Sequence, residues 1–115
     1  MKKIEAIIRR SKFEDVKKAL HEIDIDFFSY TECYGVGNEK KKKGVFRGSS
    51  DTDFIQRLEL SIVVRDINLR KTVDCLLKTA YTGEVGDGKI FVWTIDESYR
   101  IRTREAGDDS MYNKD

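Results

Sequence analysis

Two stretches decide the fold: residues 4–9 read Ile-Glu-Ala-Ile-Ile-Arg, and residues 58–65 read Leu-Glu-Leu-Ser-Ile-Val-Val-Arg. Each is a short apolar run with charge at its edge, which is the pattern of a buried strand. Ile-Ile-Arg at 7–9 is echoed by Val-Val-Arg at 63–65, and a helical pattern follows each run. The chain is therefore predicted to consist of two similar halves.

A helix is predicted after each of these strands. Ser11, with Glu14 three residues on, matches a capping box for the first helix, and Asp66 is the expected cap of the second. Apolar residues then follow at helical spacing, at Phe13, Val16, Ala19, Leu20 and Ile23 in the first helix and at Leu69, Val73, Leu76, Leu77 and Ala80 in the second. A further strand follows each helix, at 26–34 and 89–95. This order predicts an α+β fold, a ferredoxin-like βαββαβ sandwich with both helices on one face of the sheet.

Length and charge narrow the class of protein. The 115 residues fit one small domain. The 22 basic residues nearly cancel the 21 acidic ones, which argues against a nucleic-acid partner held by bulk charge. No apolar run approaches the ~20 residues that span a bilayer, and the N-terminus lacks the long apolar segment of a signal peptide. Cys33, Cys75 and the single His21 have no metal-ligand spacing, so we expect a cytoplasmic protein with reduced thiols and no metal site.

The two halves are joined by a long segment, residues 35–54. It contains four glycines and the run Lys40-Lys41-Lys42-Lys43, and it has no sustained apolar periodicity. A connection of this length in a small domain is usually functional. The four lysines repel one another and favour a solvated loop.

A glycine-rich loop joins the second helix to the last strand, where residues 82–89 read Thr-Gly-Glu-Val-Gly-Asp-Gly-Lys. Three glycines in six positions allow a tight turn that brings backbone N–H groups close to a ligand. Lys89 adds a mobile ammonium group, which favours a phosphate site. The loop is not a Walker A motif, because no Ser or Thr follows Lys89 and the loop leads into a strand.

Arg100 and Arg102 form a second basic cluster. They flank Ile101, so in an extended chain both guanidinium groups would project from one face. Two arginines and Lys89 converging on one point would repel one another unless an anion lay between them. Each hydrogen bond to a charged group contributes about 1.5–3 kcal/mol net, so three such donors could hold a polyphosphate at micromolar affinity.

The glycine-rich loop and the strand after it also carry a family resemblance. Residues 82–92, Thr-Gly-Glu-Val-Gly-Asp-Gly-Lys-Ile-Phe-Val, closely resemble the C-terminal signature of the PII signal-transduction family. The first nine residues, Phe-Arg-Gly-Ser at 46–49 and Ile-Arg-Thr at 101–103 fit the same family. The resemblance implies one PII-like domain at 1–105 with a partner-docking T-loop at 36–54. It leaves a polar tail at 106–115, which we expect to be disordered.

The resemblance further implies a homotrimer that binds ATP or ADP in clefts between subunits and docks on a partner protein, such as a membrane transporter. By position, the phosphates would be held by Lys89, Arg100 and Arg102, with loop contacts from Gly86, Asp87 and Gly88. The nucleotide would be lined at the base of the T-loop by Gly35, Val36 and Gly37, and the adenine would be surrounded by Ile7, Ser29, Val63 and Thr82. The partner-binding loop would include Arg47, which plugs ammonium channels in one branch, and Ser49, which is phosphorylated in others.

Three positions in or near the long loop depart from the family pattern. Members that sense 2-oxoglutarate carry a glutamine where this chain has Glu39, and their helper lysine corresponds to Arg57. A carboxylate facing a dicarboxylate is repulsive unless it is protonated or magnesium compensates. We therefore expect binding of 2-oxoglutarate and magnesium to be weak or absent. The loop tyrosine that is uridylylated in some members corresponds to Asp51, so that modification should be lost.

The leading hypothesis is a regulator without enzymatic activity, in which ATP and ADP compete and bias the T-loop. One alternative is a conventional 2-oxoglutarate-responsive nitrogen regulator acting on an ammonium channel. Another is a weak ATPase on the same fold, although the sequence offers no nucleophile–base pair. An RNA-binding module is the third, because strand residues Phe27, Phe28 and Tyr30 are aromatic, but the near-neutral charge argues against it.

Overall fold

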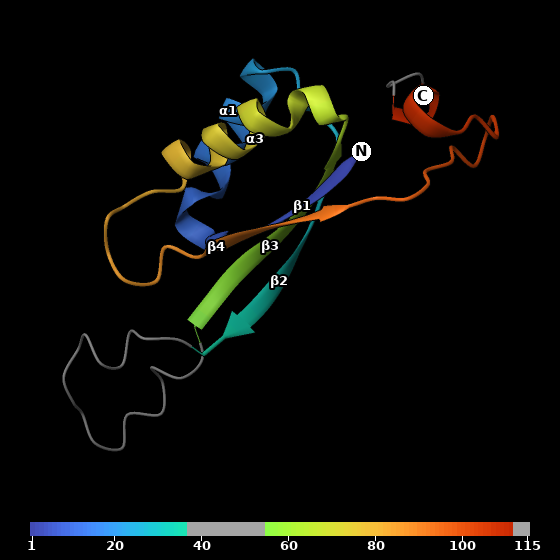
Figure 1. Ribbon diagram of the computed structural model, residues 1–115. Helices are drawn as coiled ribbons and strands as arrows, with labels where there is room; N and C mark the ends of the chain where they lie inside the picture. Colours follow the sequence, from blue (N-terminus) through green and yellow to red (C-terminus); the bar gives the residue numbers. More distant parts are fainter. Residues whose placement is uncertain (37–54, 112–115) are drawn as a thin grey trace.

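A four-stranded antiparallel sheet with two α-helices forms the body of the protein (Figure 1). The computed structural model describes residues 1–36 and 55–111. The elements in chain order are β1 (Lys2–Arg9), η1 (Arg10–Lys12), α1 (Phe13–Glu22), β2 (Ser29–Gly35), β3 (Ile55–Val64), α3 (Asp66–Thr79), β4 (Lys89–Thr94) and η3 (Gly107–Met111), where η denotes a 3-10 helix.

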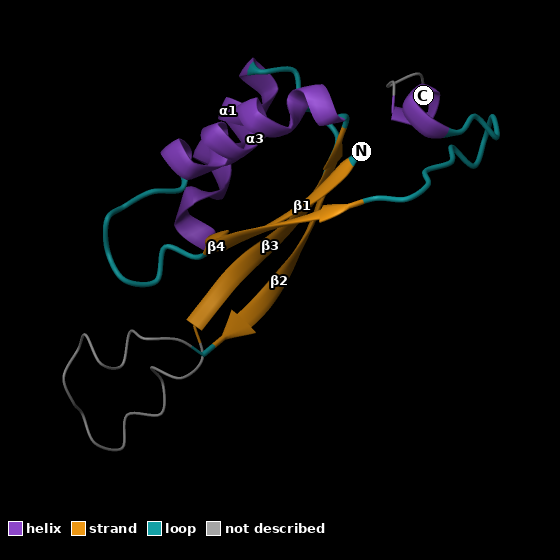
Figure 2. Ribbon diagram, viewed as in Figure 1, coloured by secondary structure: helices purple, strands orange, loops and turns teal. Residues whose placement is uncertain are grey.

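The sheet has the strand order β2-β3-β1-β4. The first strands of the two halves therefore lie side by side in the centre, and the register places Ile4 opposite both Ile62 and Val92. Both α-helices lie on one face of the sheet, and within the described residues they leave the other face uncovered (Figure 2). This arrangement confirms the predicted ferredoxin-like α+β fold.

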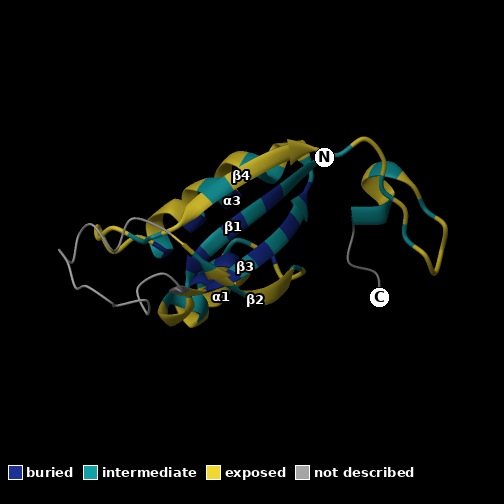
Figure 3. Cartoon of the chain, turned by 90° about the horizontal axis from the view of Figure 1, so that it is seen from below, coloured by how far each residue is buried: buried dark blue, intermediate teal, exposed yellow. Residues whose placement is uncertain are grey.

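The core lies between the helices and the two central strands, as the buried positions in Figure 3 show. Along β1 the side chains of Ile4, Ala6 and Ile8 alternate into this layer and are at most 2% exposed. From β3 and the helices come Leu58, Leu60, Ile62, Val64, Val16, Leu20 and Leu76. The edge strands β2 and β4 are much more exposed.

One position of the predicted apolar stripe of α3 is wrong. Leu76 is fully buried, but Leu77 is 58% exposed because it lies about 100° further round the helix. Thr72 lies one turn before Leu76 on the buried face of α3 and is also fully buried. Its hydroxyl donates to the carbonyl of Asn68 at 2.7 Å. This local bond satisfies the hydroxyl and lets a polar residue occupy the core.

Both predicted helix caps are wrong by one residue. The chain enters α1 through η1, so Ser11 lies inside a 3-10 turn and Lys12 occupies the capping position. Asp66 is the first residue of α3, and Arg65, with extended backbone angles, precedes it as the cap. In the first turn of α3 the Asp66 carboxylate still interacts favourably with the helix dipole.

The strand boundaries differ from the prediction by up to three residues, and β2 begins at Ser29 rather than at residue 26. The chain leaves α1 through a turn in which Asp24 has φ 66° and the Ile25 N–H donates to the Leu20 carbonyl at 2.9 Å. The extended strand can begin only after this turn. β1 starts two residues earlier than predicted and β3 three residues earlier.

The C-terminal segment is more ordered than predicted. Tyr99 forms an isolated antiparallel bridge with Ala106, and the Arg104 N–H donates to the Arg100 carbonyl at 2.7 Å. Residues 100–105 therefore form a tight turn, and the extended conformation predicted for 100–102 is wrong. The prediction of disorder is also wrong for Gly107–Met111, where Ser110 Oγ lies 2.7 Å from Ser98 Oγ.

Candidate functional site

The glycine-rich loop, residues 82–89, leads from α3 into β4 and folds back onto β1. Gly88 has φ 105°, and a Cβ built there would lie 1.7 Å from the carbonyl oxygen of Ile7. The loop backbone thus approaches the central strand so closely that a side chain has no room. Gly83 and Gly86 also have positive φ, at 87° and 102°. The loop therefore uses the conformational freedom that its sequence predicted.

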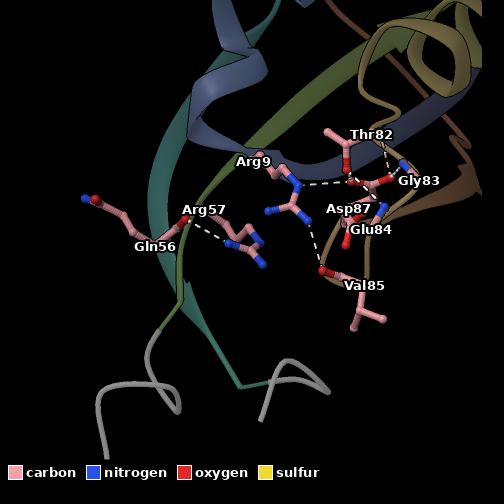
Figure 4. A network of polar contacts seen from close by, with 8 residues as sticks. All are labelled: Arg9, Gln56, Arg57, Thr82, Gly83, Glu84, Val85 and Asp87. Carbon is pink, nitrogen blue, oxygen red and sulfur yellow. Dashed lines mark hydrogen bonds and ion pairs between the residues drawn. The ribbon is translucent and has the colours of Figure 1, made fainter. Parts of the chain in front are cut away.

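Asp87 holds this loop together (Figure 4). Its carboxylate accepts the backbone N–H groups of Thr82 at 2.8 Å and Gly83 at 2.9 Å, and it also accepts the Thr82 hydroxyl. Partial burial alone would raise the pKa of the Asp87 carboxyl. The hydrogen bonds from Thr82, Arg9 and Gly83 outweigh burial and hold this pKa well below its usual value, so Asp87 is an anion at neutral pH.

Arg9, at the end of β1, is a member of this network that sequence analysis missed. Its Nε lies 3.0 Å from Asp87 Oδ1, and its Nη2 donates to the Val85 carbonyl at 2.9 Å (Figure 4). Both charged side chains are only about a quarter exposed. The two residues are 78 positions apart, so only the charge at the end of the first strand could have signalled the contact.

Two further cations lie on the same face as Arg9. Arg57 of β3 is directly opposite Arg9 in the register, and its side chain is buried. Lys89 of β4 is opposite Ile7, two residues before Arg9 on β1. Because cross-strand partners share a face of the sheet, three basic residues gather at this end of the uncovered face. Such a concentration of positive charge favours an anion.

A small pocket of about 130 Å³ opens beside the loop. It brings together four predicted site residues, Ile7, Asp87, Gly88 and Lys89, with Tyr81 at its rim. Gly35, at the end of β2, pairs with Ile55, and the register places this pair at the same end of the sheet as the start of β4. The structure thus gathers eight predicted site residues at one end of the sheet: Ile7, Gly35, Val36, Thr82, Gly86, Asp87, Gly88 and Lys89.

Four predicted site residues lie away from this end. Val63 is opposite Lys3 near the start of β1, whereas Ser29, the first residue of β2, is opposite Ser61 and lies level with Glu5 in the middle of β1. Arg100 and Arg102 follow the far end of β4, whose six residues span about 20 Å. The predicted convergence of both arginines with Lys89 does not occur within one chain. Gly37, Arg47 and Ser49, like Glu39 and Asp51, lie outside the described residues.

Contacts within the chain hold Arg100 in place. Its guanidinium is 10% exposed, lies 3.5 Å from the Glu105 carboxylate and donates to the Ser110 carbonyl at 3.2 Å. Val63 lines a separate hollow of about 300 Å³ together with Phe27, Arg65 and Met111. Of the four residues, only Val63 lines this hollow; Ser29, Arg100 and Arg102 do not.

Comparison with known proteins identifies the family. The profile described as "Nitrogen regulatory protein P-II" matches residues 1–105. Proteins of that name from Rhodospirillum rubrum and Azospirillum brasilense are 41% and 40% identical to this chain over 112 residues, covering 96% of it and all of theirs. The Klebsiella oxytoca protein of the same name is 42% identical over 94% of this chain and 97% of its own. The chain belongs to the nitrogen regulatory protein P-II family.

Membership of this family identifies the chain as a signal-transduction protein of nitrogen regulation, because the relatives are named as nitrogen regulatory proteins. Among the described helices, none is long and apolar enough to cross a membrane. In the same residues, no three His, Cys, Asp or Glu side chains gather as a metal-binding group.

Proposed function

We propose that this P-II protein senses adenine nucleotides and is not an enzyme: it binds ATP or ADP and thereby sets how residues 36–54 contact a partner protein. The observation that carries the proposal is the preformed glycine loop, held by Asp87 and Arg9 with Lys89 at its end. A loop fixed before the ligand arrives loses little conformational entropy on binding. The N–H groups of Thr82, Gly83 and Glu84 are used within the loop, so the backbone at 85–88 and the ammonium group of Lys89 are the parts that match the chemistry of a polyphosphate.

The cations supplied by one chain differ from those that the resemblance implies. Arg9 and Arg57 share the face and the end of the sheet with Lys89. Arg9 is already paired with Asp87, so it shapes the loop, and Lys89 remains the direct phosphate ligand in the proposal. Ile7 and Gly88 line the pocket next to it.

The second half of the site comes from a neighbouring subunit in this proposal. Arg100 and Arg102 follow the far end of β4, about 20 Å along the sheet from Lys89, too far to hold the same phosphates in one chain. Val63 is level with Trp93, about 13 Å along the sheet from Lys89, and Ser29 lies three strands away on β2. A homotrimer in which the glycine-loop end of one subunit meets the arginine end of the next would bring the halves together. The uncovered face of the sheet supports association, because Phe91 and Trp93 on it are 44% and 46% exposed.

The output is a protein contact, such as with a transporter or a metabolic enzyme of nitrogen assimilation. The response to 2-oxoglutarate is weak or lost, since Glu39 places a carboxylate where a sensing member has a neutral glutamine. Burial raises the pKa of Cys75 and of Cys33, so neither thiol is activated as a nucleophile.

Titration calorimetry of the full chain with ATP, ADP and 2-oxoglutarate tests the proposal. We expect micromolar binding of both nucleotides and little heat from 2-oxoglutarate. Lys89→Gln should weaken nucleotide binding about 10- to 100-fold, the loss of one charged hydrogen bond. Lys78→Gln, which removes an exposed charge from α3, is the matched control and should bind normally. Absence of nucleotide binding by the unmodified protein would refute the proposal.

A further inference from the structure

Two consecutive arginines at the corner between β1 and α1 hold two different parts of the protein. Arg9 ends β1, and Arg10 begins η1. Arg9 bonds the glycine loop through the Asp87 carboxylate at 3.0 Å and the Val85 carbonyl at 2.9 Å. Arg10 bonds strand β2, where its Nη1 lies 2.5 Å from Glu32 Oε2. The corner is thus attached to both segments at once.

The contact with Glu32 extends to β3. The other carboxylate oxygen of Glu32 accepts a hydrogen bond from Gln56 Nε2 at 3.3 Å, and Gln56 is opposite Tyr34 in the register of β2 and β3. Arg10 therefore contacts the middle of β2 and, through Glu32, the outer end of β3. The glycine loop and these strands are thus each bonded to one of two arginines that are adjacent in the chain.

We infer that Arg9 and Arg10 are positioning residues that couple the glycine loop to β2 and the outer end of β3. The biological meaning of this coupling rests on the proposed function, because a nucleotide bound at the glycine loop would change the contact between Asp87 and Arg9. Arg9 and Arg10 are adjacent in the chain, so a shift of the backbone at Arg9 also changes the position of Arg10. The coupling requires that both ion pairs change together, which a double-mutant cycle measures.

The solvent exposure of the two ion pairs determines how strong the coupling can be. Arg9 and Asp87 are about three-quarters buried, but Arg10 and Glu32 are 53% and 50% exposed. Exposed ion pairs are weak and are screened by salt, so the outer link limits the coupling to about five-fold in an equilibrium constant. The coupling should therefore shrink as ionic strength rises.

A double-mutant cycle in the ligand-free protein tests the coupling directly. Hydrogen exchange of the full chain would be measured by mass spectrometry for the unmodified protein, Asp87→Asn, Arg10→Ala and the double variant. Asp87→Asn should speed exchange at 32–35 and 55–57 about two- to five-fold when Arg10 is present, and cause no further change when it is absent. Lys12→Ala removes a basic side chain of the same turn that belongs to neither ion pair, and the coupling should survive it.

Equal acceleration by Asp87→Asn in both backgrounds would overturn the inference, as would loss of the coupling in Lys12→Ala. A second set of measurements adds ADP. Protection should appear at 83–89 in both the unmodified protein and Arg10→Ala, but extend to 32–34 only in the former; Gly35 is left out because it is a proposed nucleotide contact. Equal protection of 32–34 in both proteins would also contradict the coupling. If ADP leaves 83–89 unprotected, the nucleotide proposal fails, and the ligand-free cycle still decides the coupling.

Discussion

Replacing Gly88 by alanine tests the close approach of the glycine loop to β1. The residue has φ 105°, and a new Cβ would lie 1.7 Å from the Ile7 carbonyl oxygen. The unfavourable backbone angle costs about 1–3 kcal/mol, and relieving an overlap with central-strand backbone costs about as much again. We therefore expect Gly88→Ala to lower the free energy of unfolding by about 2–6 kcal/mol, a large part of the ~5–15 kcal/mol of a typical domain.

Two other glycines separate the contributions. Gly107 has φ 67°, but a Cβ there meets nothing within 4 Å, so Gly107→Ala should show only the backbone cost of about 1 kcal/mol. Gly35 has neither a positive φ nor a neighbour within 4 Å, and its replacement should change stability by less than about 0.5 kcal/mol. Urea unfolding followed by circular dichroism, at one fixed protein concentration, gives all three values. The reasoning is refuted if Gly88→Ala is no more destabilising than Gly107→Ala.

Three further predictions concern single side chains. The lowered pKa of Asp87 stabilises the fold above its unfolded value of about 4, so the stability lost in Asp87→Asn should be full at pH 7 and shrink as pH falls below about 4; acid-dependent urea unfolding that shows a constant difference would contradict this. The hydrogen bond that protonated His21 donates through Nδ1 to the Asp26 carboxylate raises the pKa of His21, so the single imidazole should titrate above 6.5 by proton NMR and return toward 6.5 in Asp26→Asn. Leu76→Ala should cost about 2–5 kcal/mol, whereas Leu77→Ala should stay within about 0.5 kcal/mol, and similar costs for both would show that the burial of α3 is wrong.

The order of elements could be predicted because it rests on local patterns. The apolar runs at 4–9 and 58–65 became the two central strands, since a strand buried on one face needs apolar side chains wherever it meets the helices. The cap of α1 was predicted wrongly because the sequence does not reveal the 3-10 turn at Arg10–Lys12. Ser11 lies inside that turn, so the α-helix begins one residue later than a cap at Ser11 implies. Leu77 is exposed and Thr72 is buried because they lie at different angular positions around α3, which composition does not reveal.

The glycine loop was predicted from its residues, but the contacts that fix it were not. Local sequence indicated the turn at 82–89, whereas the Arg9–Asp87 pair joins residues 78 positions apart and depends on the folded sheet. Arg100 and Arg102 were placed with Lys89 on the assumption of an extended chain. The turn at 100–105 and the length of β4 separate them within one subunit.

A site divided between subunits can be tested by mixing two defective proteins. Lys89→Gln removes the glycine-loop half of the proposed site, and Arg100→Gln removes the arginine half, so neither variant alone should bind ATP well. If each site takes one half from each of two neighbouring subunits, refolding the variants together at equal amounts should restore about one quarter of the sites to normal affinity. Titration calorimetry on the mixture measures that fraction directly. Recovery near one quarter is the result the account predicts, and no recovery in a mixture shown to exchange subunits would contradict it.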